Sequence, residues 1–285
     1  MTTARKRLIV NADDYGYYPF VTTGILEGID AGMITATGVF ANSETFSRDV
    51  RSLKDRSEVD VGVHLNLTFG QPITASMRRC LRRHGGRFTG KWQTIAMLTG
   101  SAHARKSAHE EIEAQVLRCV DEGLEIQFLN SHEHVHLLPG IWEAVQSVAK
   151  RLGIRYIRRT GSEKSAGVSG ISSRLKGNIL DVLANMQQGG VIDQPRFLGL
   201  GCSGSITLDY LGIVCPQLLA GRAYELMCHP GEKALGGLEV PQHLQAYHDW
   251  HGEKALLVGS QFRELLSRCD IELVRFRDLK EEAVN

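Results

Sequence analysis

Short apolar runs alternate with amphipathic segments along most of the 285-residue chain. An apolar run of about four to eight residues between turn signals indicates a buried strand, whereas apolar residues spaced three and four apart indicate a helix. These patterns predict strands at 7–11, 34–41, 59–67, 126–131, 154–159, 196–201, 223–229 and 271–276. They predict helices at 21–32, 108–122, 140–153 and 254–269.

The order of these elements predicts the fold class. Strands that alternate with helices favour a largely parallel sheet with helical crossovers. At this length we expect an α/β fold of the (β/α) barrel type, closed, incomplete or distorted. We expect a single domain over residues 1–285, with an irregular insertion at about 71–107. The insertion is interpreted as a solvated surface segment, or alternatively as a lid over the substrate, and it carries a basic cluster of Arg78, Arg79, Arg82, Arg83, Arg87 and Lys91.

Composition excludes several classes of protein. Lys and Arg number 33 against 32 Asp and Glu, a net charge of +1, so no polycation is available for non-specific nucleic-acid binding. The apolar run near the N-terminus is too short for a secretory signal, and no segment approaches the roughly 20 apolar residues that span a bilayer. Six scattered cysteines without a C-x-x-C pair indicate a reducing compartment. We therefore expect a cytoplasmic protein with no nucleic-acid partner and no integral membrane segment.

Four predicted strands end in an acidic residue or a histidine. Asp13 and Asp14 follow the first strand, and His64 lies near the end of the third. His132 follows the strand at 126–131, and His229 ends the one at 223–229. Each residue alone could be a turn former or a hydrogen-bonded imidazole. Because reactive side chains gather where the strands of parallel sheets end, the four positions together predict one site.

The segment "SHEHVH" (131–136) contains three histidines at alternate positions, His132, His134 and His136. If the strand continued through them, their side chains would share one face at a spacing of about 6–7 Å. Three of them could not reach one ion without a bend, and the following "LLPG" allows a bend. We expect one of these histidines to bind a metal and the others to orient substrate or support the ligands.

An aspartate and two histidines from different strands form a ligand set with open coordination positions. Such a set suits Zn²⁺, Mg²⁺, Mn²⁺, Co²⁺ or Fe²⁺, and a bound ion can lower the pKa of water from about 15.7 to about 7. The second carboxylate of the Asp13–Asp14 pair could then accept the proton of that water. His229 could protonate a leaving amine. The pattern predicts metal-assisted hydrolysis of an amide.

The motifs "IVNADDYG", "VGVHLNLTFGQPI", "NSHEHVH" and "ELMCHPG" resemble, in the same order, those of the YdjC-like family of carbohydrate deacetylases. The resemblance covers most of the chain, from the first strand through His229. It implies a (β/α) barrel-like fold and a metal-dependent hydrolase that removes acetyl from an N-acetylglucosamine-type sugar. The substrate would be a chitooligosaccharide such as diacetylchitobiose, or an N-acetylglucosaminyl conjugate. A hopanoid glycolipid, as in the hopanoid-associated branch, is the alternative.

The resemblance also implies residue roles. The ligands of one divalent ion, Mg²⁺ or Zn²⁺, would be Asp14, His64 and His132. By analogy with related polysaccharide deacetylases, Asp13 would be the general base, and His229 would be the general acid.

Substrate binding is expected at four further positions. His136 and His134 would line the pocket, together with Tyr15 and Asn66. Tyr15 stands where the family usually has phenylalanine, and Glu133 stands where glutamine or histidine is common. Members of the family associate, so we expect a homo-oligomer, most simply a dimer.

Two other classes of function compete with the deacetylase. A metal phosphoesterase or sugar isomerase could use similar ligands, although two-metal phosphoesterases need more carboxylates than the motifs supply. A non-catalytic sugar-binding protein could keep the fold. Pure binding, however, requires neither the spare carboxylate of Asp13 nor a proton donor at His229.

Overall fold

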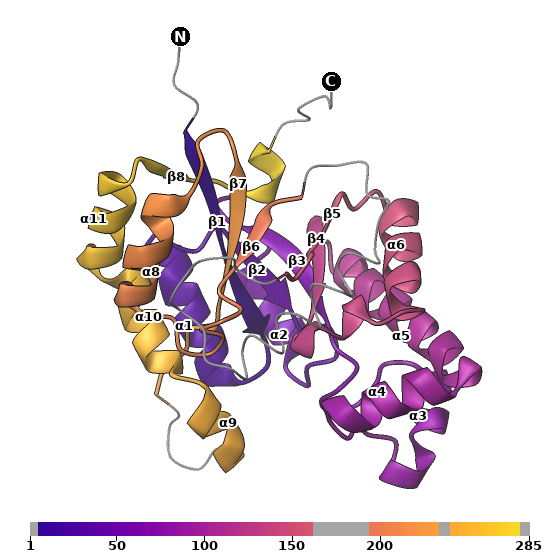
Figure 1. Cartoon of the computed structure of the whole chain (residues 1–285). Coiled ribbons are helices and arrows are strands. Elements are labelled where there is room, and N and C mark those ends of the chain that lie inside the picture. Colours follow the sequence, from indigo (N-terminus) through magenta and orange to yellow (C-terminus); the bar gives the residue numbers. More distant parts are fainter. Residues whose placement is uncertain (1–4, 162–193, 234–239, 280–285) are drawn as a thin grey trace.

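The computed structural model describes residues 5–161, 194–233 and 240–279 (Figure 1). Its sheet has eight strands in the order β5-β4-β3-β2-β1-β7-β6, with β8 beside β1, and the pairings within it are parallel. The predicted (β/α) barrel-like class is therefore confirmed. The strands are β1 Lys6–Tyr15, β2 Ala36–Val39, β3 Asp60–Leu65, β4 Ile126–Ser131, β5 Tyr156–Ile157, β6 Arg196–Leu198, β7 Ala223–Cys228 and β8 Ile271–Leu273.

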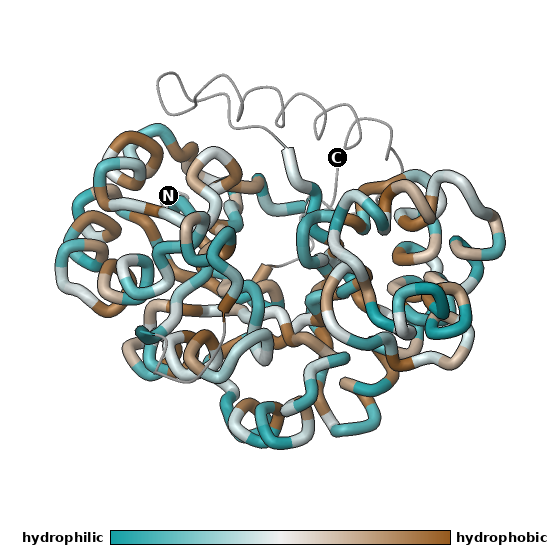
Figure 2. Tube along the Cα trace, turned by 90° about the horizontal axis from the view of Figure 1, so that it is seen from below, coloured by the Kyte–Doolittle hydropathy of each residue, from teal (hydrophilic) through white to brown (hydrophobic). Residues whose placement is uncertain are grey.

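Helices lie around the outside of the curled sheet, as the view from below shows (Figure 2). The α-helices are α1 Pro19–Asp30, α2 Phe46–Asp49, α3 Ala75–Cys80, α4 Lys91–Gly100, α5 Ala102–Asp121, α6 Ile141–Leu152, α8 Leu208–Val214, α9 Gln242–Tyr247, α10 Trp250–Val258 and α11 Ser260–Arg268. Short 3₁₀ turns are η1 Val50–Ser52, η2 Arg82–His84, η3 His132–Leu137, η4 Cys215–Gln217 and η5 Phe276–Asp278. Among the described residues, no helix has both the length and the apolar character needed to cross a membrane.

An apolar cluster fills one end of the sheet's inner face. It comprises Ile9, Ala36, Phe128, Tyr156, Val274, Phe276 and Leu279. The rings of Phe128 and Phe276 stack with centroids 4.6 Å apart. A Cβ at position 62 would lie 2.5 Å from the Phe128 ring, so this close packing requires Gly62. The cluster closes this end of the inner face and leaves the carboxyl ends of the strands for polar side chains.

Two predictions about regular structure were wrong. The helix predicted at 254–269 is two helices, because Gly259 adopts an extended conformation (φ −71°, ψ 157°) between α10 and α11. The segment 71–107, expected to be irregular, contains α3, η2, α4 and the start of α5. Ser101 caps α5 by accepting a hydrogen bond from the Ala104 N–H, a local signal for a helix start. A lid function for this segment stays a prediction.

Candidate active site

Strand periodicity carries polar residues to the open end of the sheet's inner face. Along β1, every second residue leads from Ile9 in the apolar cluster to Asn11 and then to Asp13. The same step leads from Phe128 to Asn130 along β4. Each strand therefore begins in the apolar cluster and ends in groups that can form hydrogen bonds.

A bulge places two successive carboxylates in one site. In a regular strand Asp13 and Asp14 would point to opposite faces. The register between β1 and β2 shifts after Ala12, which pairs with Thr37, whereas Tyr15 pairs with Val39. Asp14 adopts a left-handed φ of 71°, which is strained for a residue with a side chain. This distortion allows both carboxylates to join the same polar network.

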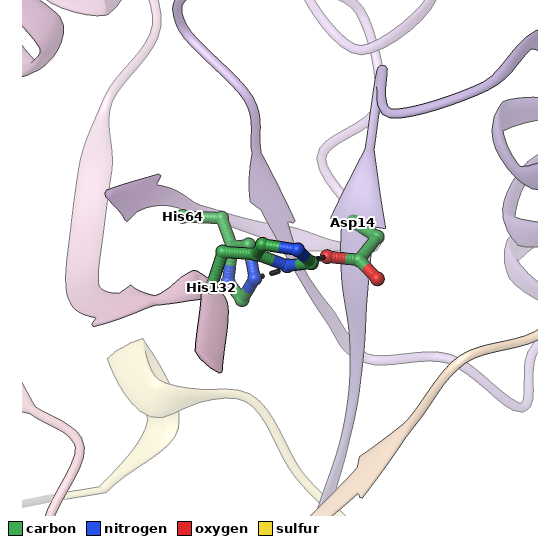
Figure 3. Close-up of side chains that lie close together, drawn as sticks. All are labelled: Asp14, His64 and His132. Atoms are coloured by element: carbon green, nitrogen blue, oxygen red, sulfur yellow. Dashed lines mark hydrogen bonds and ion pairs between the residues drawn. The ribbon is translucent and has the colours of Figure 1, made fainter. Parts of the chain in front are cut away.

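Asp14, His64 and His132 meet at the carboxyl ends of β1, β3 and β4 (Figure 3). The Oδ1 atom of Asp14 lies 3.1 Å from Nε2 of His64 and 2.9 Å from Nδ1 of His132. One candidate ligand atom from each residue lies within 4.8 Å of the others. The structure thus brings together the three residues that the resemblance implied as ligands.

The hydrogen bonds around Asn130 determine which nitrogen of His64 carries a proton. A carboxylate can only accept, so the Asn130 amide donates through Nδ2 to Oδ1 of Asp13 at 2.9 Å. Oδ1 of Asn130 therefore accepts from Nδ1–H of His64 at 2.8 Å. In the neutral imidazole Nε2 is then an unprotonated acceptor that faces the acceptor oxygen of Asp14. A cation between them relieves this repulsion, and Asn130 orients the imidazole as second-sphere partners of metal-bound histidines do.

The Asp14 carboxylate suits a cation in its charge as well. It is buried, and its Oδ2 has no hydrogen-bond partner within the described part of the chain. Burial opposes ionisation, but the charge and the hydrogen bond of the neighbouring His132 hold the pKa of Asp14 well below its usual range. The rings of Phe40 and Tyr17 lie with centroids 5.1 Å from that of His132 and form an apolar wall beside the ligands. The residues present fit a divalent ion bound through two nitrogens and one oxygen.

Asp13 belongs to a buried ion-pair network. Burial by itself would raise its pKa, but Arg158, with smaller contributions from other neighbours, brings the pKa below the usual value. Arg158 donates to the two oxygens of Asp13 at 2.5 and 2.8 Å, and through Nε to Glu225 at 2.8 Å. Glu225 also accepts from Asn11 at 2.8 Å. Asp13 is therefore an ionised carboxylate in a fixed orientation beside the candidate metal ligands.

The three histidines of 131–136 do not continue a strand. They lie in η3, where Glu133 and His134 adopt left-handed φ angles of 55° and 57°. The alternative in which the strand continues through these histidines is therefore wrong. The expected bend is present and separates their side chains. His132 reaches Asp14, whereas Nδ1 of His134 lies 3.1 Å from Oγ1 of Thr160. Burial lowers the pKa of His134 well below its usual value, and nearby Arg158 adds to this effect.

His136 is fixed by two hydrogen bonds in the interior. Its Nε2 donates to the carbonyl oxygen of Arg158 at 2.9 Å, and its Nδ1 accepts from Oγ of Ser131 at 2.6 Å. Oγ of Ser131 in turn accepts from the His136 backbone N–H at 3.0 Å. His136 is 1% exposed, so in this structure it supports the Arg158 backbone, and its substrate-binding role stays a prediction.

We expect His136 to make the protein less stable in acid. Burial lowers its pKa from 6.5 to about 3, so below pH 6.5 the unfolded chain binds a proton that the folded chain excludes. The free energy of unfolding should fall by up to about 1.4 kcal/mol per pH unit between these values. In urea unfolding at pH 7, 6 and 5, His136→Gln should reduce this slope, whereas the exposed control His103→Gln should not. An unchanged slope in His136→Gln would contradict the assignment.

His229 follows β7 and is held by its backbone. Its N–H donates to Oε2 of buried Glu253 at 2.5 Å, and Oε1 of Glu253 accepts from the Ile206 N–H at 3.1 Å. The side chain of His229 is buried, with 7% of its surface exposed. His229 follows the carboxyl end of β7, which pairs with β1, and its role as acid stays a prediction.

Tyr15 and Asn66 make internal contacts. Tyr15 is fully buried, and its hydroxyl donates to the carbonyl oxygen of Asp49 at 2.8 Å. The Asn66 amide donates to the carbonyl oxygen of Phe69 at 2.7 Å and accepts from the backbone N–H groups of Thr68 and Phe69. These contacts shape the segments after β1 and β3. Substrate contacts by the two side chains stay predictions.

The sequence reasoning missed Arg158, Asn130 and Glu225. Asn130 lies within a predicted strand two residues before His132, so alternation could have placed it on the same face. Arg158 stands next to Arg159, and no local pattern separates the buried arginine from its neighbour. Glu225 lies two residues after the start of a predicted strand, where a charged residue is usually interpreted as solvent-facing.

Comparison with known proteins shows a match over most of the chain. A family model described as YdjC-like protein matches residues 7–268. A carbohydrate deacetylase of Listeria monocytogenes serotype 4a is 32% identical over 274 residues, 96% of this chain and 100% of that one. A carbohydrate deacetylase of Clostridium beijerinckii is 26% identical over 275 residues, with the same coverage of 96% and 100%.

A solved structure agrees with the observed architecture. The crystal structure of an Enterococcus faecalis V583 protein, named for cellobiose-phosphate cleavage, aligns with a TM-score of 0.75. It is 20% identical, and the alignment covers 96% of this chain and 99% of that one. At this identity the likeness shows a shared fold.

Proposed function

Since the chain belongs to the YdjC-like family, we propose that it is a metal-dependent carbohydrate N-deacetylase. It removes acetyl from an N-acetylglucosamine-type sugar and releases acetate and a free amine. The substrate class is a chitooligosaccharide such as diacetylchitobiose, or an N-acetylglucosaminyl conjugate. The names of the full-length relatives support the reaction class.

One observation carries the proposal: Nε2 of His64 lies 3.1 Å from Oδ1 of Asp14 in the interior, and in the neutral imidazole bonded to Asn130 both atoms are acceptors. The Asn130 amide fixes this arrangement, because its other end donates to Asp13. Nδ1 of His132 lies 2.9 Å from the same oxygen of Asp14. Such a cluster is a favourable place for a divalent ion, Mg²⁺ or Zn²⁺, and an unfavourable one without a cation or a proton.

Side chains of this protein carry out the proton transfers that the proposed hydrolysis requires. An ion bound by Asp14, His64 and His132 would polarise the amide carbonyl and make a water molecule more acidic. Asp13 accepts the proton of the attacking water as the C–N bond is hydrolysed, and Arg158 keeps its carboxylate ionised and oriented. His229 donates a proton to the departing amine nitrogen. The Phe40 and Tyr17 rings exclude water beside the ligands, which strengthens these interactions.

The test combines product release with metal content. Metal-loaded protein should release acetate from N-acetylated sugars, including diacetylchitobiose and a hopanoid conjugate, and should retain one divalent ion per chain. His132→Ala should lose both the ion and acetate release, because one of three ligands is removed. The exposed control His103→Ala should keep both. Phosphate release without acetate, or sugar binding without turnover, would reject the deacetylase in favour of a phosphoesterase or a sugar-binding protein.

A further inference from the structure

Three aromatic rings stand in series beside His229. The imidazole of His248 lies with its centroid 5.0 Å from that of His229, at an interplanar angle of 61°. The His248 ring also stacks on the Trp250 ring, with the centroids 4.8 Å apart and an interplanar angle of 13°. These two residues were not among the candidates from the sequence, since "YHDW" (247–250) lies outside the four motifs.

The series contains an unusual concentration of unpaired ring nitrogens. Nδ1 of His229, Nδ1 of His248 and Nε1 of Trp250 are all buried and have no hydrogen-bond partner among the described residues. Leaving a buried polar group unsatisfied destabilises the folded protein, so three such groups in adjacent rings require an explanation. Buried waters typically bind where several polar groups lack protein partners.

The backbone holds the rings in place. The Gly231 N–H, two residues after His229, donates to the carbonyl oxygen of Trp250 at 2.9 Å. The Asp249 N–H donates to the carbonyl oxygen of Gly204 at 2.6 Å. A Cβ at Gly204 would lie 3.0 Å from Nδ1 of His248, which shows how closely the turn packs on the imidazole. His248 therefore faces His229 from a rigid support.

Within the residues that the structure describes, His229 also lacks the partner that usually orients a catalytic histidine. Glu253 is the buried carboxylate beside it, but Glu253 binds the His229 backbone N–H and the Ile206 N–H. No carboxylate or carbonyl among the described residues accepts from the His229 ring through Nδ1. The imidazole of His248 is a polar ring beside that of His229, with the centroids 5.0 Å apart.

We propose that His248 is a positioning residue that orients the imidazole of His229 through one buried water shared by their Nδ1 atoms. Trp250 fixes the plane of His248 by stacking. A bridging water is nearly equivalent in enthalpy to a direct hydrogen bond, so this arrangement replaces the carboxylate that orients histidine in other hydrolases. The role rests on the proposed function of His229 as proton donor.

Two substitutions distinguish the contribution of the His248 Nδ1 atom from that of the aromatic ring as a whole. Asn at position 248 places an amide near the position of Nδ1, whereas His248→Phe preserves the stack on Trp250 and removes the nitrogen. We expect His248→Phe to lower kcat at least about tenfold with little change in KM, and His248→Asn to stay within about threefold of wild type. The control His103→Phe, on the exposed surface of α5, should change neither constant.

A readout independent of turnover tests the positioning itself. The ¹⁵N chemical shifts of the His229 ring should move in His248→Phe and should stay near wild type in His248→Asn, with metal content and melting temperature unchanged in both. If His248→Phe keeps full kcat and unchanged ¹⁵N shifts, or if both variants are impaired equally, the proposal is wrong. If wild-type protein releases no acetate, the ¹⁵N shifts still decide the positioning, so the two failures are distinguishable.

Discussion

Asp13→Asn is expected to retain the divalent ion and to lose turnover, with kcat lower by about 10²- to 10⁴-fold. Asparagine is nearly isosteric with aspartate, but its amide cannot accept the proton of the attacking water. The candidate ligands Asp14, His64 and His132 meet through the Asp14 carboxylate and do not use Asp13 as a ligand atom. Acetate release under saturating sugar gives kcat, and elemental analysis of the purified variant gives the ion per chain.

The control is an acidic residue outside the site. Asp121 is exposed near the end of α5, so Asp121→Asn should change neither kcat nor metal content. Full turnover in Asp13→Asn would show that another group takes the proton and would remove the assigned base. Loss of the ion in Asp13→Asn would show instead that Asp13 is a ligand, and the division of labour between the two carboxylates would be wrong.

The convergence of strand ends was predictable because it depends on two regular features. Side chains alternate along a strand, and parallel strands end at the same edge. These features were sufficient to predict that the strand ends carrying the acidic residues and histidines converge on one site. The choice of Asp14, His64 and His132 as ligands came from the family resemblance, and the structure brings these three together. The pattern also predicted every strand of the described sheet, since buried parallel strands are continuous apolar runs.

The parts that escaped prediction depend on irregular backbone or distant partners. The bulge at Asp13 and Asp14 requires a left-handed residue that carries a side chain, and no composition rule indicates one. The turn at η3 needs two more such residues, Glu133 and His134. Gly259 ended a helix that side-chain spacing alone would continue.

The buried position of Arg158 could not be predicted from the sequence for a different reason. A buried charge is stabilised by its partners, and those of Arg158 lie 145 and 67 residues away in the sequence, at Asp13 and Glu225. A short stretch of sequence shows two adjacent arginines at the end of a short strand and does not indicate which of them is buried. Arg158 can be recognised only after the strand order is known, because β5 and β7 must curl toward each other across the sheet before one guanidinium can join both carboxylates.

Arg158→Met is therefore expected to produce the largest loss of stability, about 3–5 kcal/mol in the free energy of unfolding at pH 7. The guanidinium is nearly fully buried between Asp13 and Glu225, so its removal leaves two buried carboxylates without their cation. Urea unfolding of the variant and wild type measures the difference. The exposed control Arg268→Met, on α11, should stay within about 0.5 kcal/mol of wild type.

The pH dependence of Arg158→Met distinguishes a lost ion pair from lost packing. In the wild type Arg158 lowers the pKa of Asp13, so the stabilisation is present at neutral pH and is lost as pH falls through that pKa. Without Arg158, burial should raise the pKa of the Asp13 carboxyl above that of the unfolded chain, so the variant should regain stability as pH falls and this carboxyl protonates. The difference in the free energy of unfolding between the variant and wild type should then become smaller from pH 7 to pH 5. A gap of constant size would mean that the side chain contributes through packing, and Arg158 would no longer explain the ionised state of Asp13.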